Sequence, residues 1–172
     1  MCPATSLQIL VMNSSVASTK EALKVDIRHQ RRSDNMSRIH SKNTLPELKV
    51  RRMLHSYGLR YRLHNKHLPG KPDISIKKFK VAIEVMGCFW HQHKNCRYAS
   101  IPKTNTEYWI PKLESNQQRD IQNRIRLMYL GYTLFRIWEC ETKTEQILQS
   151  KAIQIMKFIE ATRRQTVQIL DT

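Results

Sequence analysis

Residues 72–96 read PDISIKKFKVAIEVMGCFWHQHKNC, and this stretch decides the fold. Two short apolar runs, 73–77 and 79–86, flank a turn at Lys77-Lys78, which is the pattern of a β-hairpin. The segment that follows, 87–96, is irregular and rich in cysteine and histidine. We therefore expect two neighbouring antiparallel strands that lead into a ligand-rich loop.

Outward from the hairpin, the sequence predicts helices and further strands. Thr44-Leu45-Pro46-Glu47 has the capping-box pattern of a helix start, and Gly58 is typical of a helix end. Hydrophobic periodicity predicts a strand at 60–64, a helix at 107–130 with a break near Pro111, a strand at 132–138 and an amphipathic helix at 144–162. The order helix, three strands, helix, strand suits an α/β sandwich.

The composition indicates a basic protein that binds a polyanion. The 172 residues include 30 Lys and Arg against 14 Asp and Glu, a formal net charge of +16. Such an excess attracts polyanions and speeds encounter with them, so nucleic acid is the first partner to consider. An anionic membrane is the second, but the chain has neither a long apolar run nor a strongly amphipathic basic helix. We expect no membrane association.

The N-terminal residues differ in character from the rest of the chain. Residues 1–24 are polar, small and aperiodic, so we expect a disordered extension there and a single domain over 25–172. The apolar stretch 7–12 is too short for a signal peptide and lacks a basic start. We therefore expect a cytoplasmic, nucleoid-associated protein. Its thiols should be reduced there, which favours metal binding over disulfides.

Two carboxylates of the hairpin are candidate metal ligands. Asp73 begins one strand and Glu84 lies near the end of the next, so antiparallel pairing could bring them together. Carboxylate oxygens suit Mg²⁺, which could polarise a phosphate and help form hydroxide. On spacing alone, the plainer reading is a strand-initiating Asp and a solvent-facing Glu. Glu47 has two readings as well, as a helix cap or as a hydrogen-bond partner of a metal-bound water.

The loop after the hairpin is a candidate zinc site. Cys88, His93 and Cys96 lie in the loop, and Cys140 just after the final strand can supply a fourth ligand for a closed tetrahedral site. The alternative is a set of unrelated thiols and surface histidines, and the choice between the two loop histidines stays open. If His93 binds zinc, His91 is left free to act as a general base.

Phe89-Trp90 is unusual inside such a loop. Aromatic side chains beside a basic surface can wedge between base steps of DNA. Core packing is the ordinary explanation of this pair.

Several separated motifs, together covering roughly residues 26–141, resemble one family: the very short patch repair (Vsr-type) endonucleases, which nick beside the T of a T·G mismatch left by deamination of 5-methylcytosine. The motifs are Ser33–Met36, Leu68–Asp73, Gly87–His91, Thr106–Trp109 with Asn116, Arg119–Asp120, and Trp138–Cys140.

This resemblance implies a restriction-endonuclease-like (PD-(D/E)XK-type) fold, a mixed sheet flanked by helices. It implies catalytic Mg²⁺ held by Asp73 and the backbone carbonyl of Val85, with His91 as general base and Glu47 orienting a metal-bound water. It also implies structural Zn²⁺ at Cys88, His93, Cys96 and Cys140.

The resemblance also implies how DNA is bound. Met36, Phe89 and Trp90 would form an intercalating wedge, and Trp109 would support the DNA-facing helix. Lys112 and Asn116 fall where family members read the mismatched bases. The expected partner is double-stranded DNA with a T·G mismatch, mismatch-repair proteins are further candidates, and a monomer is expected because a nick requires one active site.

Two departures from the family pattern bear on catalysis. Met86 stands where characterised members can carry a second histidine. Glu84 stands where some members have an apolar residue, and it could compensate as a second carboxylate ligand. Two alternatives follow: a nuclease of the same fold with another specificity, or a zinc-containing DNA-binding protein whose catalysis has decayed. The presence of Asp73 and His91 argues against the second.

Overall fold

The computed structural model describes residues 42–170, with side chains to residue 165. The second of its two units, residues 43–172, holds every element considered below. The expected extension over 1–24 and the wedge residue Met36 lie outside the described residues. The division into an extension and a single domain from residue 25 therefore stays a prediction.

The first described helix, α2 (Leu45–Ser56), has the predicted start and end. The Thr44 side chain accepts a hydrogen bond from the Glu47 backbone N–H, and the Glu47 carboxylate accepts one from the Thr44 backbone N–H. The capping box is therefore present. At the other end, Gly58 has φ +72°, a conformation that glycine adopts without a steric penalty. The predicted helix is confirmed.

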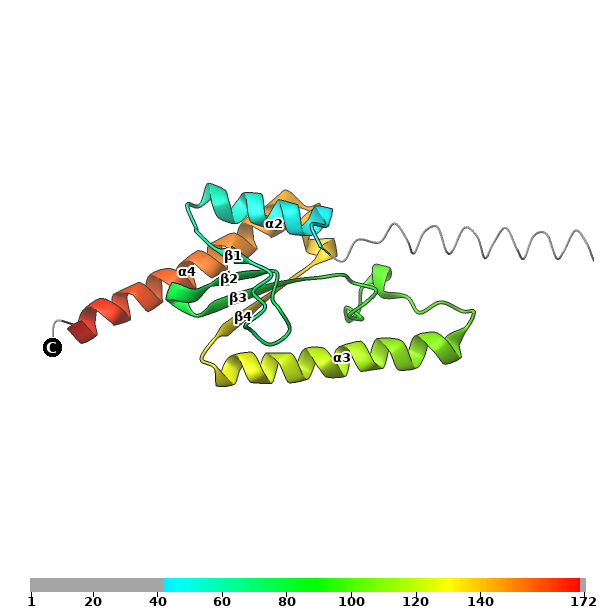
Figure 1. The fold of residues 1–172 in the computed structure, drawn as a ribbon. Helices are drawn as coiled ribbons and strands as arrows, with labels where there is room; N and C mark the ends of the chain where they lie inside the picture. Colours follow the sequence, from blue (N-terminus) through cyan, green and yellow to red (C-terminus); the bar gives the residue numbers. More distant parts are fainter. Residues whose placement is uncertain (1–41, 171–172) are drawn as a thin grey trace, which may run out of the picture. The chain divides into compact units, whose positions relative to one another are not determined.

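Four strands form one mixed sheet in the order β1-β2-β3-β4 (Figure 1). They are β1 (Arg62–Leu63), β2 (Ile74–Ile76), β3 (Val81–Met86) and β4 (Thr133–Trp138). β2 pairs antiparallel with β1 and with β3, whereas β4 runs parallel to β3. The parallel pair needs a long crossover, which the intervening helix α3 (Thr106–Tyr129) provides. The predicted hairpin and the mixed sheet are confirmed.

The hairpin turn is longer than predicted. A 3₁₀ turn spans Lys77–Phe79, Lys80 follows with φ +51°, and β3 begins two residues later than the predicted strand start at Phe79. Phe79 leaves the strand because its ring belongs to the main hydrophobic core, with the Arg163 guanidinium 5.0 Å from the ring centroid. Tertiary packing thus overrides the strand propensity of this residue.

The predicted break in the long helix at Pro111 is wrong, because α3 continues through Pro111. Proline lacks the N–H that would bond the carbonyl of Glu107, four residues earlier. Glu107 is exposed in the first turn of α3, so water can take the place of the lost bond. The terminal helix α4 (Glu145–Leu170) starts next to its predicted position but runs beyond residue 162.

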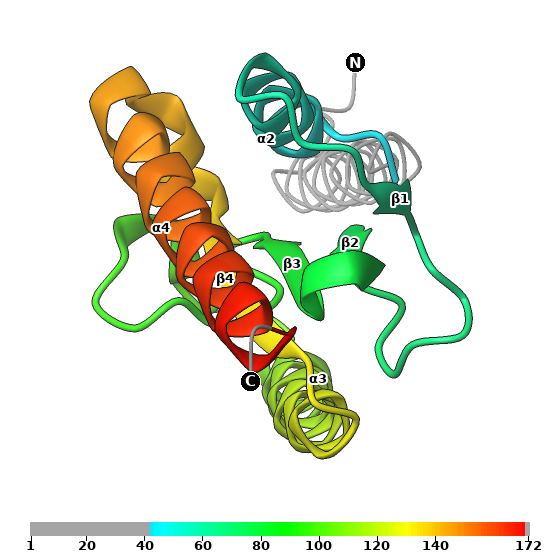
Figure 2. The same cartoon turned by 90° about the vertical axis from the view of Figure 1, so that its left-hand side faces the viewer.

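The sheet separates two hydrophobic clusters. α2 and α4 cover one face and α3 lies on the other, as Figure 2 shows end-on. Along β3, Val81 and Ile83 face the α2–α4 side and Ala82 faces α3, the alternation expected of a strand buried on both faces. The smaller cluster contains Leu68, Ala82, Leu127 and Tyr132.

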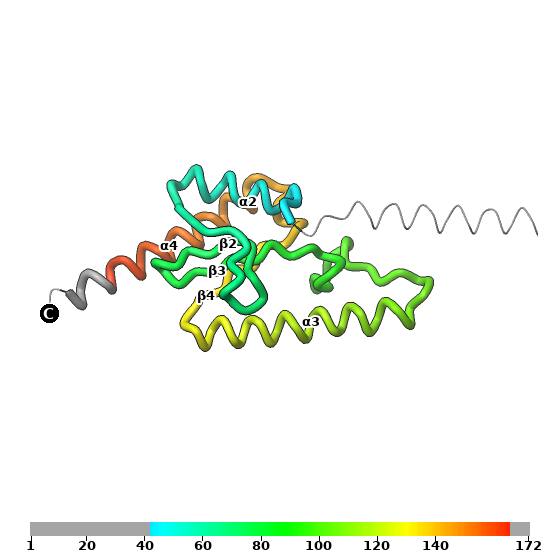
Figure 3. The backbone as a smooth tube through the Cα atoms, viewed as in Figure 1, coloured from blue at the N-terminus to red at the C-terminus, as the bar shows by residue number. Residues whose placement is uncertain are grey.

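One long connection leaves the end of β3 and leads to the start of α3 (Figure 3). Its regular structure is a single 3₁₀ turn, Arg97–Ala99. This connection contains the cysteine- and histidine-rich loop, so the expected ligands sit beyond the C-terminal edge of β3. Among the helices of residues 42–170, none combines the length and the apolar character that crossing a bilayer requires.

Candidate active site and metal centre

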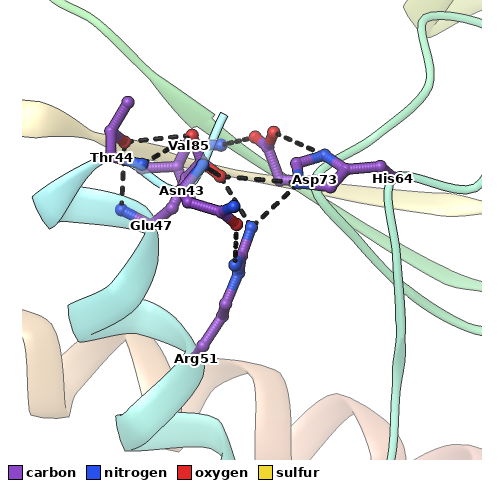
Figure 4. A network of polar contacts seen from close by, with 7 residues as sticks. All are labelled: Asn43, Thr44, Glu47, Arg51, His64, Asp73 and Val85. Atoms are coloured by element: carbon purple, nitrogen blue, oxygen red, sulfur yellow. Dashed lines mark hydrogen bonds and ion pairs between the residues drawn. The ribbon is translucent and has the colours of Figure 1, made fainter. Parts of the chain in front are cut away.

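Three side chains with metal-ligand chemistry converge beside the sheet edge: Glu47, His64 and Asp73, the carboxylate cluster. Their donor atoms lie within 4.8 Å of one another. Antiparallel pairing of β1 with β2 brings two of them together, because the His64 N–H donates to the Asp73 carbonyl at 3.1 Å. The N-terminus of α2 supplies Glu47. Figure 4 shows the three side chains converging from these elements.

Asp73 is the member of the cluster best placed to bind a cation. Its Oδ2 accepts the Val85 N–H at 2.8 Å, and its Oδ1 lies 3.8 Å from His64 Nδ1. Burial raises the pKa of this carboxyl, and the hydrogen bond from Val85 offsets part of that effect. A partly buried carboxylate of this kind is stabilised in its charged form by a bound cation, and its hard oxygens fit Mg²⁺.

Glu47 is occupied by hydrogen bonds from the protein. Oε1 accepts from the Thr44 hydroxyl at 3.0 Å and the Thr44 N–H at 3.5 Å, while Oε2 accepts from the Asn43 N–H at 3.0 Å and Arg51 Nη2 at 2.7 Å. Four bonds use the roughly four lone-pair sites of a carboxylate. The capping reading of Glu47 is confirmed, and its orientation of a metal-bound water stays a prediction.

Glu84 has a different partner from the one expected. It lies opposite Arg136 in the β3–β4 register, and Arg136 Nε donates to its Oε2 at 3.2 Å. Burial raises the pKa of Glu84, and the Arg136 charge offsets part of that effect. Glu84 is not a member of the carboxylate cluster formed by the described residues. Its role as a second metal ligand stays a prediction, which requires it to exchange Arg136 for the ion.

His91 is oriented by α3. Its Nδ1 lies 2.5 Å from Asp120 Oδ2, and Arg136 Nη2 donates to the Asp120 carbonyl at 3.2 Å. A carboxylate that accepts the Nδ1–H leaves Nε2 as a proton acceptor, which is the arrangement a general base needs. Arg136 therefore links the Glu84 side chain to the His91–Asp120 pair.

The second group of candidate ligands consists of Cys88, His93, Cys96 and Cys140, whose ligand atoms again lie within 4.8 Å of one another. We call it the zinc-ligand cluster, after the ion predicted from the sequence. His93 Nδ1 lies 3.4 Å from Cys140 Sγ and 3.7 Å from Cys88 Sγ. The ring of His93 stacks on Trp138 at 4.1 Å. The structure thus groups His93 with the thiols and pairs His91 with Asp120.

The electrostatics of the zinc-ligand cluster favour a cation. All three of its cysteines are free thiols. Burial raises the pKa of Cys88 to about 12 and also raises the pKa of Cys140. A hydrogen bond from the Tyr98 backbone N–H lowers the pKa of Cys96. Thiolates at the buried positions need a bound cation, and three thiols with one imidazole match a closed tetrahedral zinc site.

An aromatic group lies in the connection and at the start of α3. The Phe89 ring meets Trp90 at 5.1 Å and Trp109 at 5.3 Å, both edge-on, and Tyr108 meets Trp109 at 5.1 Å. Neither hydrophobic cluster of the described residues includes these rings, and they are only partly covered. Simple core packing therefore does not account for Phe89 and Trp90.

The two predicted base readers on α3 differ in exposure. Lys112 is exposed, whereas Asn116 is 6% exposed. The Asn116 amide donates to the Trp90 carbonyl at 3.1 Å and accepts from Arg119 at 2.5 Å. The structure gives Asn116 a loop-holding contact, and its base-reading role stays a prediction.

The family model for the DNA mismatch endonuclease Vsr matches residues 25–97. The type II nicking enzyme V.NmeAIP of Neisseria meningitidis is 40% identical over 130 residues, which cover 76% of this chain and 92% of that protein. The type II nicking enzyme V.XorIIP of Xanthomonas oryzae is 41% identical, covering 74% of this chain and 93% of that protein. The Escherichia coli DNA mismatch endonuclease Vsr is 34% identical, covering 71% of this chain and 78% of that protein. The chain belongs to the Vsr family.

Within this Vsr-family chain, sequence reasoning missed three residues of the polar networks. Asp120 belongs to one of the family motifs, but the sequence analysis assigned it no function. It assigned none to His64 or Arg51 either. The antiparallel pairing of 60–64 with 73–77 was a signal for His64, because it places this residue across from Asp73. Arg51 lies one helical turn after Glu47, a spacing at which opposite charges meet, and this signal was also present.

Proposed function

We propose that this Vsr-family endonuclease hydrolyses one strand of duplex DNA at a T·G mismatch and uses Mg²⁺ to do so. Membership of the Vsr family makes the protein a DNA endonuclease. The observation that carries the finer proposal is Asp73, a partly buried carboxylate with a raised pKa that is fixed by the Val85 N–H.

Asp73 and the carbonyl of Val85 would hold the metal, which supplies positive charge at the scissile phosphate and acidifies bound water. The carboxylate is immobilised before any ion arrives, because Val85 belongs to β3 and Asp73 precedes β2. Such preorganisation is what a hydrolytic site requires, since the ligand does not reorganise during the reaction. Glu47 would not bind the metal directly but would orient a metal-bound water, with its oxygens held by the helix cap.

His91 would act as the general base. Asp120 holds the imidazole through Nδ1 at 2.5 Å, so Nε2 can take a proton from the attacking water. The water oxygen forms a bond to phosphorus while the bond to the leaving DNA oxygen breaks, without a covalent protein intermediate. Met86 replaces a histidine of some family members, and it is buried here. The His91–Asp120 pair would therefore carry proton transfer without a second histidine.

DNA recognition would come from the aromatic group and from the strong positive charge of the chain. Phe89 and Trp90, with Met36 from outside the described residues, would enter the base stack, and Trp109 would support them from α3. Lys112 and Asn116 would face the mismatched pair. Zn²⁺ at the zinc-ligand cluster would hold the aromatic loop against the end of β4. We further propose that the protein acts as a monomer and that mismatch-repair proteins are additional partners.

A second specificity is supported by the names of two relatives, which are type II nicking enzymes. The same site would then nick DNA at another recognition sequence. The mismatch reading is preferred because an insertable aromatic group is most useful for a base pair that is already destabilised.

The test is strand cleavage of end-labelled duplexes that carry one T·G mismatch in several flanking contexts, beside T·A duplexes of the same sequence. We expect Mg²⁺-dependent nicking of the T-containing strand and none in Asp73→Asn. Equal nicking of both duplexes would reject mismatch specificity and keep the nuclease. Tight binding without cleavage under any divalent metal would reject the enzyme in favour of a DNA-binding protein.

A further inference from the structure

A buried arginine lies inside the carboxylate cluster. Arg51 is 7% exposed, and its Nη1 donates to Asn43 Oδ1 at 2.7 Å. Its Nη2 donates to Glu47 Oε2 at 2.7 Å and lies 3.0 Å from His64 Nε2, as Figure 4 shows. Its Nε is buried and has no hydrogen-bond partner among the described residues. Burying a guanidinium with an unsatisfied N–H costs free energy, so its position calls for an explanation beyond stability.

The contact between Arg51 and His64 fixes the proton of the imidazole. A guanidinium only donates hydrogen bonds, so His64 Nε2 must be the acceptor at 3.0 Å. A neutral histidine that accepts at Nε2 carries its proton on Nδ1. Nδ1 is the nitrogen that faces Asp73 Oδ1, at 3.8 Å. His64 also has φ +44°, an uncommon conformation for a residue other than glycine, which the surrounding contacts maintain.

In this arrangement, two of the three members of the cluster, His64 and Glu47, have no free lone pair with which to bind a metal. The Nε2 lone pair of His64 points to Arg51, and its Nδ1 carries a proton. The oxygens of Glu47 are filled by the helix cap and by Arg51. Asp73 is left as the member with an oxygen, Oδ1, that is open to a cation.

We propose that Arg51 determines the metal coordination of this site by locking the tautomer of His64. With Arg51 in place, His64 directs an N–H toward Asp73 and is not a metal ligand. Arg51 and His64 are thus positioning residues, and the ion is bound through oxygen atoms alone. The inference rests on the proposed role of Asp73 as the metal ligand.

The benefit of the lock is selectivity for the metal. Oxygen ligands suit Mg²⁺, whereas a site with an imidazole nitrogen beside carboxylates favours zinc and other transition metals. If the zinc-ligand cluster binds zinc as proposed, zinc is available to this protein. A free His64 nitrogen beside Asp73 would therefore compete for zinc at the catalytic centre.

The test replaces Mg²⁺ by Mn²⁺ in zinc-loaded protein and asks whether a nitrogen atom binds the ion directly. Electron spin-echo envelope modulation detects such a nitrogen, and titration followed by electron paramagnetic resonance gives the affinity. We expect no nitrogen signal in the wild type. In Arg51→Met we expect a clear nitrogen signal and an affinity for Mn²⁺ higher by roughly 10–100-fold, the scale on which outer residues tune metal sites.

Matched variants assign the signal. Arg52→Met removes the same charge from the adjacent, exposed position of α2 and should behave as the wild type. Adding His64→Gln to Arg51→Met should abolish the nitrogen signal. A nitrogen signal in the wild type, or none in folded Arg51→Met, would overturn the inference. Mn²⁺ binding that is unchanged in Asp73→Asn would instead reject the metal centre of the proposed function.

A measurement on the wild type covers the case in which Arg51→Met does not fold. Long-range proton–nitrogen NMR correlations of the imidazoles identify the protonated nitrogen, and His64→Gln assigns the His64 signals. We expect the proton on Nδ1. A proton on Nε2 would overturn the inference.

Discussion

The carboxylate cluster and the zinc-ligand cluster are equally compact, but they are held together in different ways. In the carboxylate cluster, regular elements and hydrogen bonds fix each member: a helix cap for Glu47 and the Val85 N–H for Asp73. In the zinc-ligand cluster, His93 Nδ1 lies beside the thiols of Cys88 and Cys140, and the Tyr98 backbone N–H bonds the Cys96 thiol. The loop that carries Cys88, His93 and Cys96 has left-handed backbone at Gln92 and Asn95, with φ +48° and +58°.

This difference supports a division of labour between the two metals that we propose. A site that is already formed can bind and release its ion without a change in the fold, as a catalytic centre must. A site whose ligands are crowded thiols on an irregular loop depends on its ion for folding energy. We therefore expect loss of Mg²⁺ to affect the rate of nicking and loss of Zn²⁺ to affect stability.

The largest effect is expected from Asp73→Asn, which should lower the nicking rate by about 10³-fold or more, because charge stabilisation at the phosphate is lost. Without divalent metal and at neutral pH, Asp73→Asn should be more stable than the wild type. Burial raises the pKa of Asp73 in the folded protein above its ordinary value, so the folded state binds more protons at this group than the unfolded state does. Stability therefore falls as pH rises from the ordinary pKa through the raised one.

Chemical denaturation of both proteins without divalent metal, at acidic and neutral pH, measures this effect. The stability difference between Asp73→Asn and the wild type should grow as pH rises. A variant that is less stable than the wild type at neutral pH would contradict a preformed site that carries an uncompensated charge.

Asp120→Asn should lower the single-turnover nicking rate by about 10²-fold, at the lower end of what general base catalysis contributes. The amide cannot hold His91 Nδ1–H as a carboxylate does, and DNA affinity should change little. Glu114→Gln is the control, because Glu114 is an exposed acid of the same helix. Equal losses in the two variants would point to surface charge and not to orientation of His91.

Cys140→Ser should lower the unfolding temperature by roughly 10 °C, because a bound ion adds several kcal/mol to the folded state of a domain of this size. Differential scanning calorimetry of the zinc-loaded proteins measures the shift. Mn²⁺ binding at Asp73 should persist below that temperature. If Mn²⁺ binding is lost while the protein is folded, the two clusters are not independent.

The smallest effect is expected from the loop before Asp73. Gly70 has φ +72°, and an added Cβ would lie 3.0 Å from Asn123 Nδ2 on α3. Gly70→Ala should lower the free energy of unfolding by about 1–2 kcal/mol. Gly58→Ala is a matched control, since Gly58 has the same φ and open space around it. Equal losses would mean that backbone conformation alone matters and that contact with α3 does not help to hold the loop.

Local patterns in the sequence predicted much of the fold. The capping box at Thr44 and Glu47, the hairpin and the final strand depend on neighbouring residues, and the structure confirms each of them. The turn at Phe79 and the continuity of α3 at Pro111 were predicted wrongly. Burial of a ring under α4 decides the first, and solvation of one carbonyl near a helix end accounts for the second.

The ligand groups were predictable to different degrees. A candidate zinc site of three cysteines and a loop histidine was recognisable from chemistry alone, but the choice between His91 and His93 was not. The pairing of Glu84 with Arg136 was not, because it depends on the register of a parallel strand pair 52 residues apart in sequence. The Arg51–His64 contact likewise joins two elements whose relative placement the sequence does not state.

The most direct test of the division between the two metals records two quantities on one zinc-loaded sample as Mg²⁺ is withdrawn and restored. These are the nicking rate on a T·G duplex and the unfolding temperature of the protein. We expect the rate to fall to background and to recover fully, with the unfolding temperature unchanged throughout. Nicking that survives removal of Mg²⁺ while zinc stays bound would contradict the assignment of catalysis to the carboxylate cluster.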